Sequence, residues 1–142
     1  MAELMRPLQL KEIAIAADDA KAREERLYKE KMAKQKKDLE EAFMSRDVHP
    51  EVAERVNDAV KRAAEQGHSQ IQVLTFSSSY CNDRGRRINN MDPDWPESLE
   101  GFAKKAFEYW QKELKPLGYK LQAEILNFPD GVPGDVGLFL KW

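Results

Sequence analysis

Residues 77–96 (SSSYCNDRGRRINNMDPDWP) combine fixed positive charges with aromatic rings in one polar stretch. Guanidinium groups bind phosphates, and aromatic faces stack on unpaired bases. The sequence therefore predicts an anion or nucleic-acid contact in this loop, and its candidate ligand-binding residues are Tyr80, Arg84, Arg86, Arg87 and Trp95. Three nearby aspartates leave two alternatives open, a solvated or salt-bridged loop and a contact with the acidic surface of a protein partner.

Cys81, the only cysteine, lies in the same stretch. A nucleophilic cysteine needs a lowered pKa and a base within hydrogen-bonding reach, usually a histidine. The arginines could stabilise a thiolate, but nothing in the sequence places His49 or His68 beside it. A structural cysteine is therefore favoured, and no catalytic residue is predicted.

Metal and cofactor sites have little support. The two histidines are nineteen residues apart, and no spacing resembles a zinc or calcium loop. Asp83, Asp92 and Asp94 leave a hard-cation site open as an alternative. The sequence predicts no metal and no cofactor.

The composition is that of a soluble protein, with 34% charged residues and a net charge of -2. With 23 basic and 25 acidic residues, any nucleic-acid binding would have to come from a local patch. A single cysteine fits a reducing compartment. No apolar run is long enough to span a bilayer, and no signal peptide is recognisable at the start. We expect a cytoplasmic protein with no membrane partner.

Residues 8–46 contain no Gly or Pro and are rich in strong helix formers, with Pro7 suited to the first turn. They predict an extended charged helix that occupies a first domain, residues 1–46. Apolar and neutral residues recur at 4-3-4-3 spacing, as in a heptad seam, at Tyr28, Met32, Gln35, Leu39 and Ala42. Only about two heptads are present. Three readings stay open: a solvated helix resting on its own domain, a self-associating coiled coil, and an arm that folds on binding a protein partner.

Residues 47–142 predict a compact α+β domain. A helix with Pro50 in its first turn ends near Gln66, and residues 71–76 form a strand. A second helix with a continuous apolar stripe begins at Asp94, which has the spacing of an N-cap. Strands over residues 119–128 and 136–142 follow and form an antiparallel hairpin. A helical crossover would make the first two strands parallel, in a three-stranded sheet packed on helices.

Two functional hypotheses follow from these elements. The first is a non-enzymatic, cytoplasmic protein-interaction or oligomerisation module, with the long helix as its binding surface. The second is nucleic-acid or phospholigand binding through residues 77–96. That loop should be ordered, since Ile88, Met91 and Trp95 could anchor it on the domain.

Overall fold

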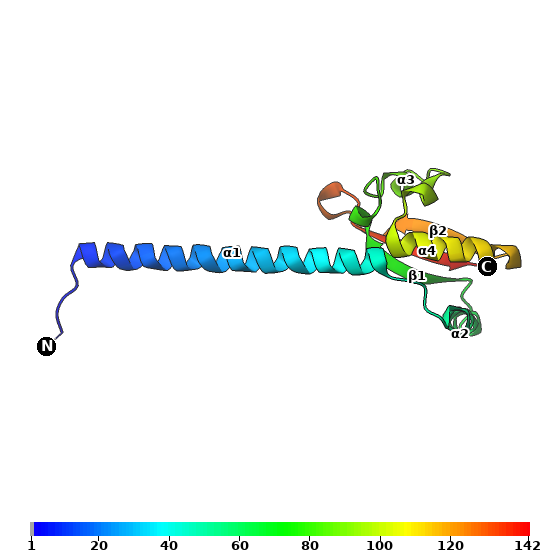
Figure 1. The fold of residues 1–142 in the computed structure, drawn as a ribbon, viewed down its shortest axis with the longest axis horizontal. Coiled ribbons are helices and arrows are strands. Elements are labelled where there is room, and N and C mark those ends of the chain that lie inside the picture. Colours follow the sequence, from blue (N-terminus) through cyan, green and yellow to red (C-terminus); the bar gives the residue numbers. More distant parts are fainter. Residues whose placement is uncertain (1) are drawn as a thin grey trace. The chain divides into compact units, whose positions relative to one another are not determined.

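The computed structural model describes residues 2–142, which divide into two units. The first unit ends at Glu41, and the second spans Ala42–Trp142. Helix α1, Pro7–Ser45, is 39 residues long and buries none of them (Figure 1). The long N-terminal helix is confirmed. It holds its shape because it has no Gly or helix-interior Pro, and because oppositely charged residues recur four apart.

Besides the end of α1 and several short 3₁₀ and π-helical turns, the second unit contains three α-helices and three strands, in the α+β class that the sequence predicts (Figure 1). In chain order they are α2 (Val52–Glu65), β1 (Gln70–Ser77), α3 (Arg86–Asn89), α4 (Gly101–Tyr109), β2 (Lys120–Ile125) and β3 (Asp135–Lys141). Helix α2 ends where expected, because Gly67 follows it with φ 83°.

The sheet has the strand order β1-β3-β2, and both neighbouring pairs are antiparallel. The predicted hairpin of the last two strands is confirmed, with Ile125 opposite Val136. Strands β1 and β2 run in the same direction, as a helical crossover requires. They are not hydrogen-bonded to each other, however, because β3 lies between them and pairs with both.

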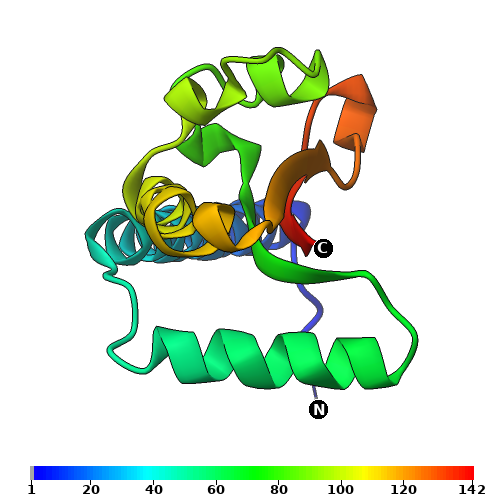
Figure 2. The same cartoon turned by 90° about the vertical axis from the view of Figure 1, so that its right-hand side faces the viewer.

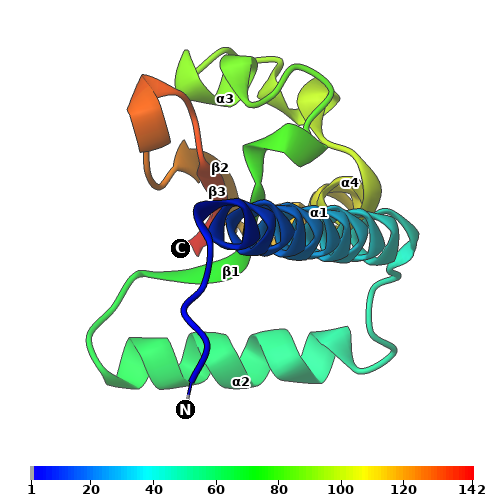
Figure 3. The ribbon, with the colours of Figure 1, turned by 90° about the vertical axis from the view of Figure 1, so that its left-hand side faces the viewer.

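One face of the sheet carries the core. Phe76, Val136 and Leu138 are buried there, together with Leu99 and Ala103 from the region of α4. The opposite face is polar at most positions but carries the half-buried Phe139 on the central strand, between Gln72 and Gln122. Helix α2 lies at the margin of the unit, with β1 as its nearest strand (Figures 2 and 3).

The predicted helix start at Asp94 is wrong. Residues Trp95–Ser98 form a 3₁₀ turn, and α4 begins only at Gly101. The Asp94 carboxylate is not used as a cap, because it pairs with Arg87 at 3.4 Å. After Tyr109 the helix widens into a π-helical turn, Trp110–Leu114. The strand predicted over residues 119–128 is also shorter than expected, at Lys120–Ile125.

Candidate functional site

Residues 77–96 form an ordered excursion that is pinned to the core by apolar side chains. Ile88 is buried in the hydrophobic cluster. The Tyr80 ring lies 4.8 Å from that of Phe43, and the Trp95 ring 5.9 Å from that of Phe107, centroid to centroid. Both aromatic residues predicted to face a ligand therefore pack internally.

Met91 was predicted as a further anchor, and this prediction is wrong. Its side chain is 83% exposed, and its backbone has a left-handed φ of 54°. The position is the turn after α3, where the chain reverses and the side chain is directed to solvent. Ile88, one helical turn earlier, takes the buried position instead.

Asp83 organises the arginine-rich part of the loop. Its carboxylate accepts hydrogen bonds from the backbone N–H groups of Gly85 and Arg87, each at 3.0 Å. The Arg87 Nε lies 3.9 Å from Asp83 Oδ2 and 3.4 Å from Asp94 Oδ2, so this guanidinium is held between two carboxylates. Asp83 thus accepts a backbone N–H group in the first turn of the short helix α3 and partly neutralises the arginine cluster.

Arg84 and Arg86 are the members of the predicted ligand set that remain exposed. Tyr80 and Trp95 pack inside, and Arg87 is ion-paired. None of the five side chains lines either of the two cavities described below. Anion or nucleic-acid binding by the loop stays a prediction that depends on these two guanidinium groups.

Cys81 lies in an environment that suppresses thiolate formation. The side chain is buried, and burial together with the nearby Asp83 carboxylate raises its pKa from 9.0 to about 11. His49 lies instead at the start of α2, where its Nε2 is 3.1 Å from Arg55 Nη2 and its Nδ1 accepts the Glu51 N–H. The structure therefore lends no support to a cysteine–histidine enzyme.

The Cys81 thiol is expected to react about 100-fold more slowly with iodoacetamide at pH 8 than an ordinary cysteine, because raising the pKa from 9.0 to about 11 lowers the thiolate fraction by that factor. Since the folded-state pKa is raised, this group stabilises the fold below pH 9 and loses that contribution as pH rises from 9 towards 11. Mass spectrometry of the alkylated protein measures the rate. The same protein in urea is the control and should react at the ordinary rate; equal rates would contradict the burial argument.

Two kinds of feature are absent from residues 2–142. These residues include no group of three or more His, Cys, Asp or Glu side chains placed to hold a metal ion. Within the same range, no helix has both the length and the apolar character needed to cross a membrane.

Helix α1 carries a narrow exposed band, which we call the α1 stripe. Its members follow one another at intervals of 4, 3, 4, 7, 4, 3 and 4 residues, and they are Leu10, Ala14, Ala17, Lys21, Tyr28, Met32, Gln35 and Leu39. Because 18 residues make five turns of an α-helix, the second four members lie directly in line with the first four. The stripe contains most of the predicted heptad seam and extends it towards the N-terminus. All eight side chains are exposed.

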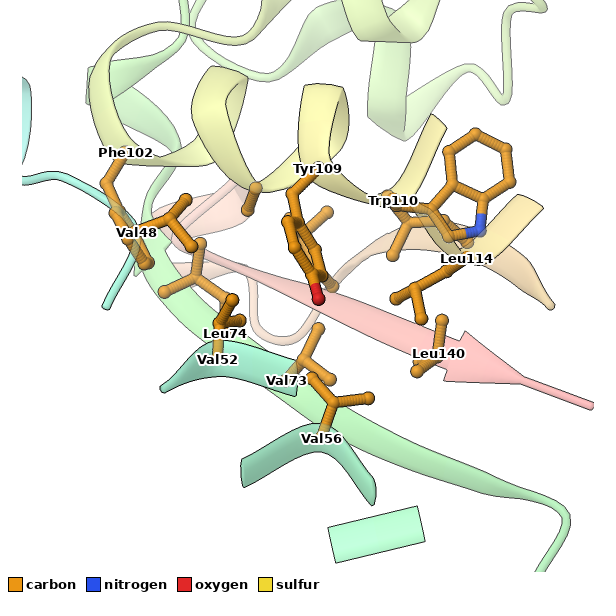
Figure 4. Close-up of a pocket in the computed structure, with 13 residues that line it drawn as sticks. Val48, Val52, Val56, Val73, Leu74, Phe102, Tyr109, Trp110, Leu114 and Leu140 are labelled. Carbon is orange, nitrogen blue, oxygen red and sulfur yellow. The ribbon is translucent and has the colours of Figure 1, made fainter. Parts of the chain in front are cut away.

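A cavity of about 130 Å³ lies inside the second unit, between α2, the sheet and the α4 region. Its walls are almost entirely apolar (Figure 4) and are formed by Val48, Val52, Val56, Val73, Leu74, Phe102, Ala106, Tyr109, Trp110, Leu114, Leu121, Leu138 and Leu140. The Tyr109 hydroxyl points away from α4 into the space between the two helices (Figure 4). The sequence carries valines at helical spacing along α2, at Val52, Val56 and Val60, but gives no sign that their packing leaves a space.

Comparisons with protein families, with curated proteins and with solved structures find no match for this chain.

Proposed function

We propose that this protein is a self-associating module in which the α1 stripe pairs, antiparallel, with the α1 stripe of a second copy. The observation that carries the proposal is the spacing of the stripe, whose intervals read the same in both directions. A two-fold axis between antiparallel helices requires such a palindrome, because each position must meet its counterpart on the other chain. With the axis between Glu24 and Glu25, Leu10 meets Leu39, Ala17 meets Met32, and Lys21 meets Tyr28.

These pairs are complementary in size and chemistry. The two leucines supply apolar contacts at both ends of the pairing. Ala17 leaves room for the longer Met32 side chain, and the Lys21 ammonium can lie on the Tyr28 ring as a cation–π contact. All of these side chains are exposed in the single chain, so pairing would remove apolar surface from water.

The charge distribution of α1 also favours the antiparallel direction. Residues 12–22 carry an excess of two acidic side chains, and residues 27–37 an excess of four basic ones. The antiparallel register sets these segments against each other, with Glu12 opposite Lys37 and Asp18 opposite Lys31. A parallel pair would oppose the basic segment to itself, and like charges on facing helices disfavour that arrangement.

The association should be modest in strength. Two alanines, Lys21 and Gln35 occupy half of the stripe, so the apolar area that it buries is small. We expect a dissociation constant on the order of 1–100 μM, which light scattering and sedimentation can follow over the accessible protein concentrations.

Deleting residues 1–41 is expected to abolish concentration-dependent association, because it removes the whole stripe and leaves Phe43 and Met44 in the second unit. In the full chain, Leu39→Glu should weaken association at least about 10-fold, since it would bury a charge against Leu10 of the other copy. The matched control is Leu27→Glu, another exposed leucine of α1 (65% exposed, against 66% for Leu39) that lies outside the stripe. Sedimentation equilibrium measures all three variants.

Crosslinking distinguishes the two directions. In an antiparallel pair, a Leu10→Cys chain should form a disulfide with a Leu39→Cys chain when the two are mixed, and neither should pair efficiently with itself. Buried Cys81 is shielded from this reaction. A parallel dimer would give the opposite pattern. A full-length protein that is monomeric at all concentrations, or equal effects of the two glutamate substitutions, would refute self-association through the stripe.

A further inference from the structure

The cavity of the second unit has the chemistry of a site for a small apolar molecule. Its volume, about 130 Å³, is close to the roughly 150 Å³ of engineered apolar cavities that stay dry and bind benzene or xenon. Of its two side chains with polar atoms, Trp110 already donates its indole N–H to the Tyr119 carbonyl at 3.1 Å. The Tyr109 hydroxyl is thus the polar group that the side chains of the wall offer to a ligand.

Two irregularities of the backbone meet at this cavity. The pairing of β1 with β3 shifts between Gln72 and Leu74, which makes Val73 the extra residue of a β-bulge, and Val73 lines the cavity. On the opposite wall, Trp110 and Leu114 begin and end the π-helical turn, and both also line it. Bulges and π-turns are both enriched at functional sites, where they redirect side chains. Their convergence on one apolar space sets it apart from an ordinary packing defect.

The cavity is partly open to solvent, and Val73 on its wall is 40% exposed. Helix α2 forms one side of it with Val52 and Val56, whose side chains form no hydrogen bonds (Figure 4). Before α2, Lys105 Nζ of α4 pairs with Asp47 Oδ1 at 2.6 Å. After α2, the His68 N–H bonds to the Ala63 carbonyl at 2.8 Å, which is a contact within the C-terminal turn of α2 itself. A small molecule can therefore enter beside the two valines from the solvent side.

A second, shallow hollow on the surface indicates where the polar end of a ligand would lie. It shares Val48 and Tyr109 with the apolar cavity, and its other walls are Asp47, Lys105, Glu108 and Lys112. Two acidic and two basic side chains give this hollow no net charge. A neutral polar group that hydrogen-bonds the Tyr109 hydroxyl fits it better than a carboxylate or an ammonium.

We propose that the cavity between α2, the sheet and α4 binds a small, uncharged amphipathic molecule, a single aromatic ring or short branched chain with one hydroxyl or carbonyl group beside Tyr109. The site belongs to the second unit alone. It is independent of self-association through α1, and either proposal can fail without the other.

The test uses two probes of the same shape, 4-methylphenol and toluene, titrated into the full-length protein by calorimetry and by thermal unfolding. Both should bind saturably and raise the Tm, because a ligand that binds only the folded state stabilises it. Tyr109→Phe removes the hydroxyl but keeps the ring. It should weaken 4-methylphenol binding about 3–10-fold, the effect of one hydrogen bond, and leave toluene binding within about twofold.

A pair of alanine substitutions on α4 supplies the structural control. Ala106 lines the cavity, whereas Ala103 is fully buried in the close-packed core. Ala106→Leu should fill the space, keep or raise the Tm, and abolish binding of both probes. Ala103→Leu should lower the Tm because no space exists for the added carbons. Absence of saturable binding of either probe to the unmodified protein would overturn the proposal, as would unchanged binding in Ala106→Leu.

Discussion

Replacing Phe76 with alanine is expected to lower the free energy of unfolding by about 3–5 kcal/mol, the usual cost of removing a fully packed phenylalanine. The Phe76 side chain is 5% exposed and lies in the core cluster opposite Val136 of the central strand. Its ring also stacks on Phe43 at 5.4 Å between centroids. The substitution removes both contacts and leaves a cavity. Small domains are stable by only about 5–15 kcal/mol, so this loss approaches the stability of the whole unit.

Urea unfolding followed by circular dichroism measures the loss, and Phe128→Ala is the matched control. Phe128 is 52% exposed beside the β2–β3 connection, so its truncation should cost less than about 1 kcal/mol. Similar losses in the two variants would mean that Phe76 does not occupy the core position described.

Replacing Gly101 with alanine is expected to cost about 3 kcal/mol or more. Gly101 starts α4 with a left-handed φ of 56°, and that conformation alone costs other residues about 1–2 kcal/mol. A Cβ at this position would also lie 2.7 Å from Met44 Cα and 3.0 Å from the Phe43 carbonyl oxygen. These are backbone atoms, so no side-chain rotation can relieve the clash, and the chain itself would have to move.

Gly67→Ala separates the two contributions. Gly67 also has a left-handed φ, 83°, but a Cβ there would meet nothing within 4 Å. Its substitution should therefore cost only about 1 kcal/mol. Thermal unfolding of both variants tests the difference; if they lose equal stability, the close approach of Gly101 to Met44 contributes nothing.

The helices and strands whose pattern lies within their own residues could be predicted from the sequence. Helix α1 follows from 39 residues with no Gly and with Pro only at the first position, and α2 ends at its glycine as expected. The strands at Phe76 and Leu138 follow from apolar residues two apart. In each case the information lies within a few residues of the element itself.

Features that depend on long-range packing could not be predicted. Strand β3 lies between β1 and β2, and this order depends on pairing between segments that are far apart in the chain. The late start of α4 depends on Asp94 finding Arg87 as its partner, and on the close fit of Gly101 against Met44. A local capping pattern cannot reveal that its carboxylate is already engaged elsewhere.

The candidate sites divide in the same way. The composition of residues 77–96 correctly indicates an ordered loop, but it cannot show that Tyr80 and Trp95 turn inward to Phe43 and Phe107. The cavity exists because the side chains of α2 and α4 do not fill the space between the two helices. That shortfall depends on how the two segments pack together, so neither segment alone reveals it.

The central position of β3 has a consequence for the biosynthesis of the protein. Strands β1 and β2 pair only with β3, which follows both of them in the chain. Until residues 135–141 have emerged from the ribosome, neither strand has a native partner, and the apolar residues of both strands stay exposed. Helix α1, with only local hydrogen bonds, forms as it leaves the ribosome. A partly synthesised chain therefore exposes the unpaired edges of β1 and β2 until β3 follows, which makes that stage of synthesis the one most prone to aggregation.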